Sequence, residues 1–113
     1  MHEMAICESI RQTLEAQSQA HNFTRVKRVC LEIGPLSGVE MDALRFGFDV
    51  VMRGSVAQDA VLEIVACPAE AWCMNCAQTV PIQKRFDACE KCGSYQLQVT
   101  SGEELRIKEL EVH

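Results

Sequence analysis

The spacing of apolar residues predicts that the chain begins with an amphipathic helix followed by a strand. Between residues 4 and 20, apolar residues recur at intervals of three and four, which is the period of one helical face. The residues on this face are Ile6, Cys7, Ile10 and Leu14. Between residues 24 and 34 apolar and polar residues alternate instead. This alternation is typical of a half-buried strand, whose inner residues are Val29, Leu31 and Ile33.

A second helix and a second strand are predicted further along the chain. Ser37 and Glu40 have the spacing of a capping box, which places the start of a helix at this point. Gly54 is a suitable residue to end the helix. The apolar face of this helix consists of Met41, Leu44, Phe48 and either Val51 or Met52. Residues 60–66 form an apolar, β-branched run that predicts a strand.

The pattern changes at Cys67, after which cysteine, proline and glycine become frequent and the periodicity fades until about Tyr95. We interpret this segment as an inserted module. Beyond it, residues 95–100 and 105–112 are separated by the short turn Ser-Gly-Glu, which predicts a β-hairpin.

These elements predict an α+β fold in which two helices pack on a small three-stranded sheet, with an inserted four-cysteine zinc-ribbon module. A sheet with both helices on one face is the economical way to bury two amphipathic helices. We expect residues 1–66 plus 101–113 to form this α/β domain and residues 67–100 to form a separate zinc-binding domain.

Composition and charge narrow the class of protein. The chain has 113 residues, with 48% apolar and 24% charged, as in ordinary globular proteins. Its formal charge of −5 argues against a nucleic-acid binder, which needs a basic face. We find no apolar run of the ~18 residues that a membrane span requires. The start of the chain also lacks the basic and apolar regions of a secretory signal, so we expect a cytoplasmic protein.

Four of the seven cysteines have the spacing of a metal site. Cys73 and Cys76 form one Cys-x2-Cys pair, and Cys89 and Cys92 form a second pair twelve residues later. Two such pairs at this separation predict a zinc site. Four thiolate ligands leave no open position, which indicates a structural Zn²⁺ rather than a catalytic one. The alternatives are two redox-active pairs or an iron site, but redox pairs occur singly in a βαβ context that is absent here.

The other three cysteines are Cys7, Cys30 and Cys67. We interpret them as small buried apolar residues, and we expect Cys67, which lies where the inserted module begins, to be the most exposed of the three.

The opening residues Met1, His2 and Glu3 form a candidate nickel site. We expect Met1 to be retained, because its removal is efficient only before a small residue. The α-amine of Met1 and the amide and imidazole nitrogens of His2 can then chelate one ion in a plane, and Glu3 can add its amide nitrogen or its carboxylate. Planar nitrogen donors suit Ni²⁺ or Cu²⁺, and nickel is favoured because cytosolic copper is mostly Cu⁺. On these residues alone, a solvated, frayed terminus remains the alternative.

The order of these segments resembles the HypA/HybF family of hydrogenase nickel-incorporation proteins over essentially the whole length. The segments that carry the resemblance are the initial MHE, LEIGPLSGVE, ALRFGFDVV, RGSVAQDAVLEI, the two Cys-x2-Cys pairs and GEELRIKELEV. The resemblance implies a metallochaperone that holds Ni²⁺ transiently at Met1, His2 and Glu3. Some members place histidines beside the zinc cysteines, and this chain has none there.

The resemblance also implies partners. Members of the family act with a HypB-type GTPase and deliver nickel to the large subunit of nickel–iron ([NiFe]) hydrogenase, and in some organisms they also serve urease maturation. We expect no catalytic activity, because the sequence contains neither a Ser/His/Asp set nor a phosphate-binding loop. The main rival hypothesis is a zinc-ribbon interaction or adaptor protein without nickel transfer. The sequence leaves open whether the protein is a monomer or a homodimer.

Overall fold

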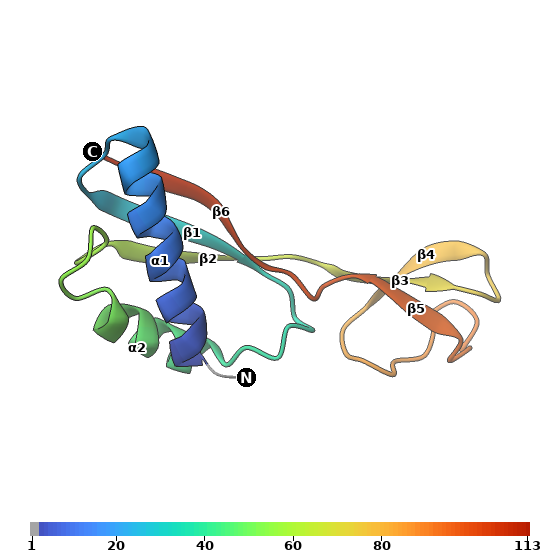
Figure 1. The fold of residues 1–113 in the computed structure, drawn as a ribbon. Helices are drawn as coiled ribbons and strands as arrows, with labels where there is room; N and C mark the ends of the chain where they lie inside the picture. Colours follow the sequence, from blue (N-terminus) through green and yellow to red (C-terminus); the bar gives the residue numbers. More distant parts are fainter. Residues whose placement is uncertain (1–2) are drawn as a thin grey trace. The chain divides into compact units, whose positions relative to one another are not determined.

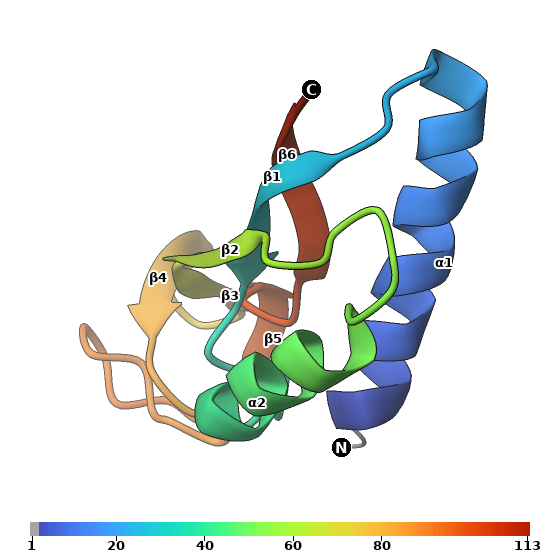
Figure 2. The ribbon, with the colours of Figure 1, turned by 90° about the vertical axis from the view of Figure 1, so that its left-hand side faces the viewer.

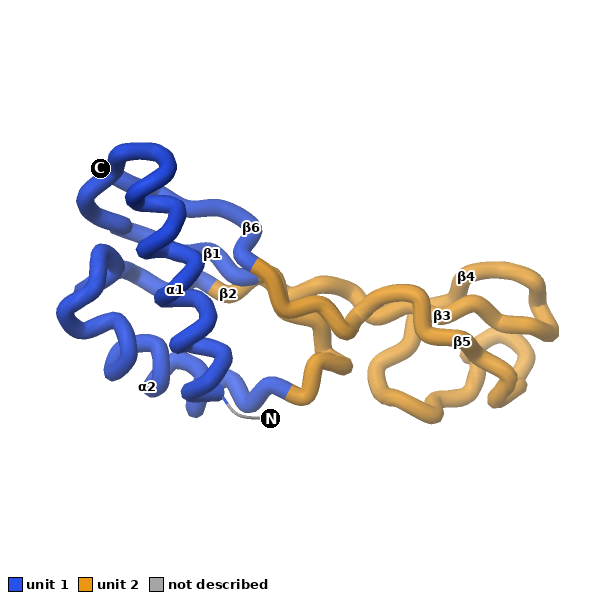
Figure 3. The backbone as a smooth tube through the Cα atoms, in the orientation of Figure 1, with its two compact units in different colours: residues 1–31, 39–63, 107–113 blue, residues 32–38, 64–106 orange. Residues whose placement is uncertain are grey.

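The computed structural model describes residues 3–113, and the chain forms two compact units (Figure 3). Unit 1 comprises residues 1–31, 39–63 and 107–113, and unit 2 comprises residues 32–38 and 64–106. Unit 2 therefore includes a short segment, residues 32–38, that lies far upstream of the cysteine-rich part of the chain.

Two helices and a three-stranded sheet are present, as the sequence predicts (Figures 1 and 2). The helices are α1 (Glu3–His21) and α2 (Met41–Val51), and both lie on the same side of the sheet. The sheet has the order β2-β1-β6 and consists of β1 (Val26–Ile33), β2 (Val61–Ala66) and β6 (Leu105–Val112). The backbone amide of His113 donates to the carbonyl of Arg25 at 2.9 Å, which joins the end of β6 to the start of β1.

The core of unit 1 forms where the predicted apolar faces of the two helices meet. Cys7 and Leu14 of α1 are fully buried and Ile10 is 8% exposed, while Ile6 is half-buried. From α2 and its end the buried side chains are Leu44, Phe48 and Met52. The apolar periodicity of both helices thus marks the face that is removed from water, which is the main source of their stability.

Helix α2 begins later than the predicted capping box implies. Glu40 itself is the N-cap, with extended backbone angles, and its carboxylate accepts hydrogen bonds from the amides of Asp42 and Ala43. Ser37 lies in the preceding turn, where its amide donates to the carbonyl of Gly34. The prediction of a Ser37–Glu40 capping box was wrong, because a glutamate carboxylate can accept hydrogen bonds from the same first-turn amides that a serine hydroxyl would.

Unit 2 contains a second sheet, with the order β4-β3-β5. Its strands are β3 (Ala69–Cys73), β4 (Gln78–Ile82) and β5 (Leu97–Ser101), and β3 pairs antiparallel with both neighbours. One face of this sheet is buried, in a cluster of Leu36, Ala69, Ala71 and Ile82 with the partly buried Leu97 and Val99. The contribution of Leu36 explains why residues 32–38 belong to unit 2.

The predicted hairpin of the last two strands is wrong, because β5 and β6 belong to different sheets. The connection between them pairs with the segment after β1 instead. Gly34 donates to the carbonyl of Glu104 at 2.8 Å, and Leu36 donates to that of Gly102 at 2.7 Å. Gly102 has φ +109°, and a Cβ at this position would lie 2.6 Å from the Cβ of Ala69. The glycine therefore lets the chain cross closely over β3 rather than reverse.

Neither helix within residues 3–113 is both long and apolar enough to cross a membrane.

Candidate metal centres

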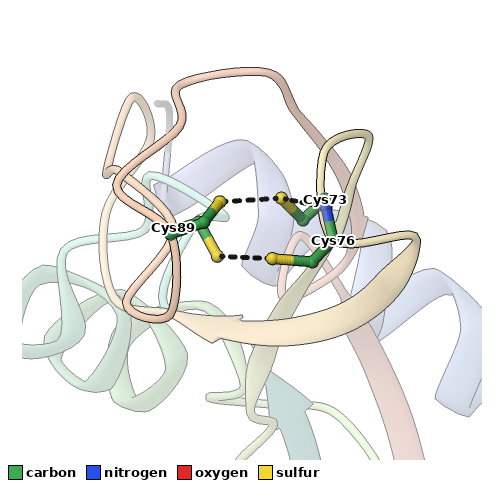
Figure 4. Close-up of side chains that lie close together, drawn as sticks. Cys73, Cys76 and Cys89 are labelled. Atoms are coloured by element: carbon green, nitrogen blue, oxygen red, sulfur yellow. Dashed lines mark hydrogen bonds between the residues drawn. The ribbon is translucent and has the colours of Figure 1, made fainter.

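The four cysteines of the two Cys-x2-Cys pairs come together in unit 2. Figure 4 shows the side chains of Cys73, Cys76 and Cys89 pointing toward one another. All four Sγ atoms lie within 4.8 Å of one another. Cys73 and Cys89 are buried, Cys76 is half-buried and Cys92 is exposed. Cys73, Val80 and Cys89 form a small core cluster, so the cysteines also supply part of the apolar interior of the module.

The spacing of the sulfurs fits one tetrahedral ion. The Sγ atoms of Cys73 and Cys92 are 3.6 Å apart, and those of Cys76 and Cys89 are 3.9 Å apart. Four thiolates at about 2.3 Å from a tetrahedral Zn²⁺ lie about 3.8 Å from each other. Two of the six sulfur–sulfur separations are therefore close to the value that such an ion requires, and all six are within 4.8 Å.

The first pair lies in a tight turn that joins β3 to β4. The amide of Cys76 points at the Sγ of Cys73, at 3.4 Å, and the amide of Ala77 donates to the carbonyl of Cys73 at 2.8 Å. Closing this turn puts Ala77 in the left-handed region, with φ +54°. Backbone amides aimed at a sulfur stabilise its thiolate form.

The second pair repeats this arrangement with a glycine at the matching position. The amide of Lys91 lies 3.4 Å from the Sγ of Cys89, and the amide of Gly93 donates to the carbonyl of Cys89 at 2.8 Å. Gly93 has φ +76°, a conformation that costs glycine little. The two turns thus share the backbone hydrogen bond that closes them and the left-handed residue after the second cysteine, which is alanine in one and glycine in the other.

Hydrogen bonds shift the pKa values of the two less buried cysteines, Cys76 and Cys92, in opposite directions. The side chain of Asn75 and the backbone of Ser94 lower the pKa of the Cys92 thiol to about 6. The hydrogen bond with Cys92 raises the pKa of Cys76 to about 12. One sulfur is therefore anionic at neutral pH, which favours the arrival of a cation. Sequence reasoning missed Asn75 and Ser94, although both lie within two residues of a cysteine ligand.

Of the predicted amino-terminal site, Met1 and His2 lie outside the described residues. Glu3 is the first residue of α1, and its carboxylate accepts a hydrogen bond from the backbone amide of Glu40 at 3.2 Å. The start of α1 is thereby attached to the N-cap of α2. This role of Glu40 could not be predicted from the sequence, because it depends on two segments that are 37 residues apart.

The three remaining cysteines do not join the cluster. Cys7 and Cys30 are 0% and 1% exposed, as expected for small apolar residues, and Cys67 is half-exposed. Burial, together with the charges of Glu3 and Glu8, raises the pKa of Cys7 to about 11.

Comparisons with known proteins agree on one family. The family model described as "Hydrogenase/urease nickel incorporation, metallochaperone, hypA" matches residues 1–112. The chain is 60% identical over 112 residues to the hydrogenase maturation factor HypA of Azotobacter chroococcum mcd 1, which covers 99% of both chains. It is 57% identical, with the same coverage, to the hydrogenase maturation factor HypA of Azotobacter vinelandii.

The fold also matches a solved structure, the solution structure of the Ni metallochaperone HypA from Helicobacter pylori. The TM-score is 0.72 at 28% identity, over 99% of this chain and 97% of that chain.

Proposed function

Because this chain belongs to the HypA family of hydrogenase/urease nickel-incorporation metallochaperones, we propose that it binds Ni²⁺ at its amino terminus and delivers the ion to the large subunit of nickel–iron hydrogenase. The observation that carries the proposal is the hydrogen bond between the Glu3 carboxylate and the Glu40 amide. It holds the third residue of the chain, itself one of the proposed ligands, at the N-cap of α2.

We assign the ligands to the α-amine of Met1, the amide and imidazole nitrogens of His2 and the amide nitrogen of Glu3. The Glu3 amide is preferred over the carboxylate because the carboxylate already accepts the Glu40 amide, so coordination would break that bond. Four nitrogen donors in a plane are a set that Ni²⁺ accepts.

In unit 2 we propose that Cys73, Cys76, Cys89 and Cys92 hold a structural Zn²⁺. The sulfur separations of 3.6 and 3.9 Å support this assignment, as does the absence of room for a fifth, exchangeable ligand in a four-thiolate site. Each turn that carries a Cys-x2-Cys pair is called a knuckle. Bound zinc would hold the two knuckles together and so stabilise a module that has only a small apolar core. We therefore assign nickel binding to the helical part of the chain and zinc binding to the segment 67–100.

The same proposal names the partners and the compartment. A HypB-type GTPase and the hydrogenase large subunit are the proteins with which we expect this chain to act, with urease maturation as a second destination. Within the described part of the chain none of the seven cysteines forms a disulfide. Cysteines without disulfides in such number suit the reducing cytoplasm, where we place the protein.

The test is a nickel titration of the zinc-loaded full chain, with His2→Ala and His21→Ala as a matched pair. His21 ends α1, far along the chain from the proposed ligands. We expect His2→Ala, and also acetylation of the α-amine, to weaken nickel binding by about ten- to a hundredfold. His21→Ala should bind as the wild type does. Affinity should rise steeply with pH near neutrality, because coordination displaces protons.

A second measurement connects binding to delivery. Nickel-loaded wild type should restore hydrogenase activity in an extract from cells that lack this protein, and His2→Ala should not. If His2→Ala binds and delivers nickel as the wild type does, the amino-terminal site is wrong and the zinc-ribbon adaptor becomes the better hypothesis.

A further inference from the structure

A shallow groove runs between the two helices of unit 1. It has a volume of about 670 Å³. The residues that line this α1–α2 groove are Met4, Glu8, Arg11, Gln12, Glu15, Val50 and Val51. Those from α1 recur at the period of a helix and form a stripe beside the buried one. They span the twelve residues from Met4 to Glu15, a rise of about 16 Å at about 1.5 Å per residue.

The groove has an apolar base. Met4 is 44% exposed on α1, and Val50 and Val51 contribute from the last turn of α2. Phe46, one turn before Val50, is 70% exposed and extends the apolar surface along α2. A flexible methionine among exposed apolar side chains is typical of surfaces that bind peptide segments.

The charges at the groove favour a basic occupant. Among residues 3–113, the Glu8 carboxylate has no hydrogen bond or ion pair. The Glu15 carboxylate accepts a hydrogen bond from the backbone amide of Val56, in the loop after α2, at 3.2 Å. The guanidinium of Arg11 faces the carbonyls at the end of α2, donating to Val51 at 2.8 Å and to Arg53 at 3.3 Å. Arg11 therefore already has acceptors on α2 and the residues after it, whereas the Glu8 carboxylate can still pair with a cation.

We propose that the α1–α2 groove is the docking site for an amphipathic helix of a partner protein, with apolar anchors along one side and lysine or arginine beside them. The length of the stripe, about three turns, matches helix-in-groove recognition with anchors at i, i+3 or i+4, and i+7. A second copy of this chain is a poor occupant, because the chain carries a net charge of −5 and its own α1 presents the carboxylates that form the groove.

The role of this docking in nickel transfer rests on the proposed function. Met4, which lines the groove, directly follows Glu3. A helix docked there would place the partner beside the amino-terminal nickel ligands, where the ion is handed over.

The experiment measures the binding of a labelled synthetic helix by fluorescence anisotropy. The probe is a leucine–lysine amphipathic peptide of about fourteen residues, compared with a scrambled peptide of the same composition and a leucine–glutamate analogue. The protein is the zinc-loaded full chain. Val50→Glu changes the groove, and Val61→Glu is its matched control, since Val61 is 62% exposed on β2 and does not line the groove. Glu8→Lys, at an exposed position, is a second variant that should not disturb folding.

We expect Val50→Glu and Glu8→Lys each to weaken binding of the basic amphipathic peptide by about tenfold, and Val61→Glu to change it less than about twofold. Raising NaCl from about 50 to about 300 mM should weaken wild-type binding more than that of Glu8→Lys.

The proposal is overturned if the scrambled or acidic peptide binds equally well, or if the groove variants bind as the wild type does. Nickel titration separates the two proposals. If Val50→Glu binds nickel normally but no longer binds the peptide, docking at the groove is supported. If the wild type does not bind nickel, only the proposed function is refuted.

Discussion

The carboxylate of Glu3 and the backbone amide of Glu40 lie 3.2 Å apart and form a hydrogen bond that joins the first turn of α1 to the N-cap of α2. Glu40 in turn uses its own carboxylate to accept the first amides of α2. Two carboxylates therefore satisfy backbone donors at one helix N-terminus, where the positive end of the helix dipole favours them. Glu3, the third of the proposed nickel ligands, lies at this junction.

Glu3→Gln should bind nickel within about threefold of the wild type, because the amide nitrogen of residue 3 is unchanged and the glutamine carbonyl can still accept the Glu40 amide. Glu3→Ala should lower the free energy of unfolding by about 0.5–1.5 kcal/mol, since it leaves the Glu40 amide without this acceptor. Nickel titration and thermal unfolding measure the two effects. A loss of nickel binding in Glu3→Gln as large as that in His2→Ala would show instead that the carboxylate is a ligand.

The sequence was sufficient for those parts of the fold that depend on local periodicity or on spacing. The apolar stripes predicted α1 and α2, and the Cys-x2-Cys spacing predicted which four sulfurs would converge. The sheet membership of the last two strands was not predictable in this way. Two short strands joined by Ser-Gly-Glu look like a hairpin, and only the pairing of residues 102–104 with residues 34–36 directs them into separate sheets.

Contacts between distant segments account for the rest of what the sequence left undetermined. The start of α2 depends on which side chain reaches its first amides, and both Ser37 and Glu40 are chemically able to do so. The pKa of Cys92 depends on Asn75, which lies in the opposite knuckle. No pattern along the chain encodes these relationships, because each is set by how the folded segments meet.

The residues after the two knuckles make a matched pair for testing backbone strain. Ala77 has φ +54° and Gly93 has φ +76°. Gly93→Ala should destabilise unit 2 by about 1–2 kcal/mol, the cost of a left-handed conformation for a residue with a Cβ. Ala77→Gly should not destabilise it, because relief of the same strain offsets the greater freedom of glycine in the unfolded chain. Competition with a chelator, which reports the zinc affinity of each variant, measures the difference. Equal losses in both variants would contradict this account.

Removal of the metal should unfold unit 2 selectively. The apolar clusters of unit 2 are small, and one of them includes two of the cysteine ligands, whereas α1 and α2 bury their apolar faces within unit 1. We expect a chelator, or Cys89→Ser, to change the emission of Trp72, the single tryptophan, which precedes Cys73. The helical signal in far-ultraviolet circular dichroism should persist. Cys30→Ser, at a buried cysteine outside the cluster, is the control, and its tryptophan emission should respond to zinc as in the wild type. Simultaneous loss of both signals would show that unit 1 depends on the metal as well.

The protons released on zinc binding should depend on pH in a way that reports Cys92. Its thiol has a pKa of about 6, so at about pH 7.5 it is already a thiolate and zinc displaces fewer than four protons from the cluster. At about pH 5.5, below that pKa, Cys92 is protonated and must also release its proton, so the number released should rise by about one. Calorimetric titration of the apoprotein in buffers of different ionisation enthalpy counts these protons. Asn75→Ala removes the first hydrogen bond that lowers this pKa, and it should therefore raise the number released at about pH 7.5 toward the value at low pH. The same count at both pH values in the wild type would show that Cys92 is not the pre-ionised ligand.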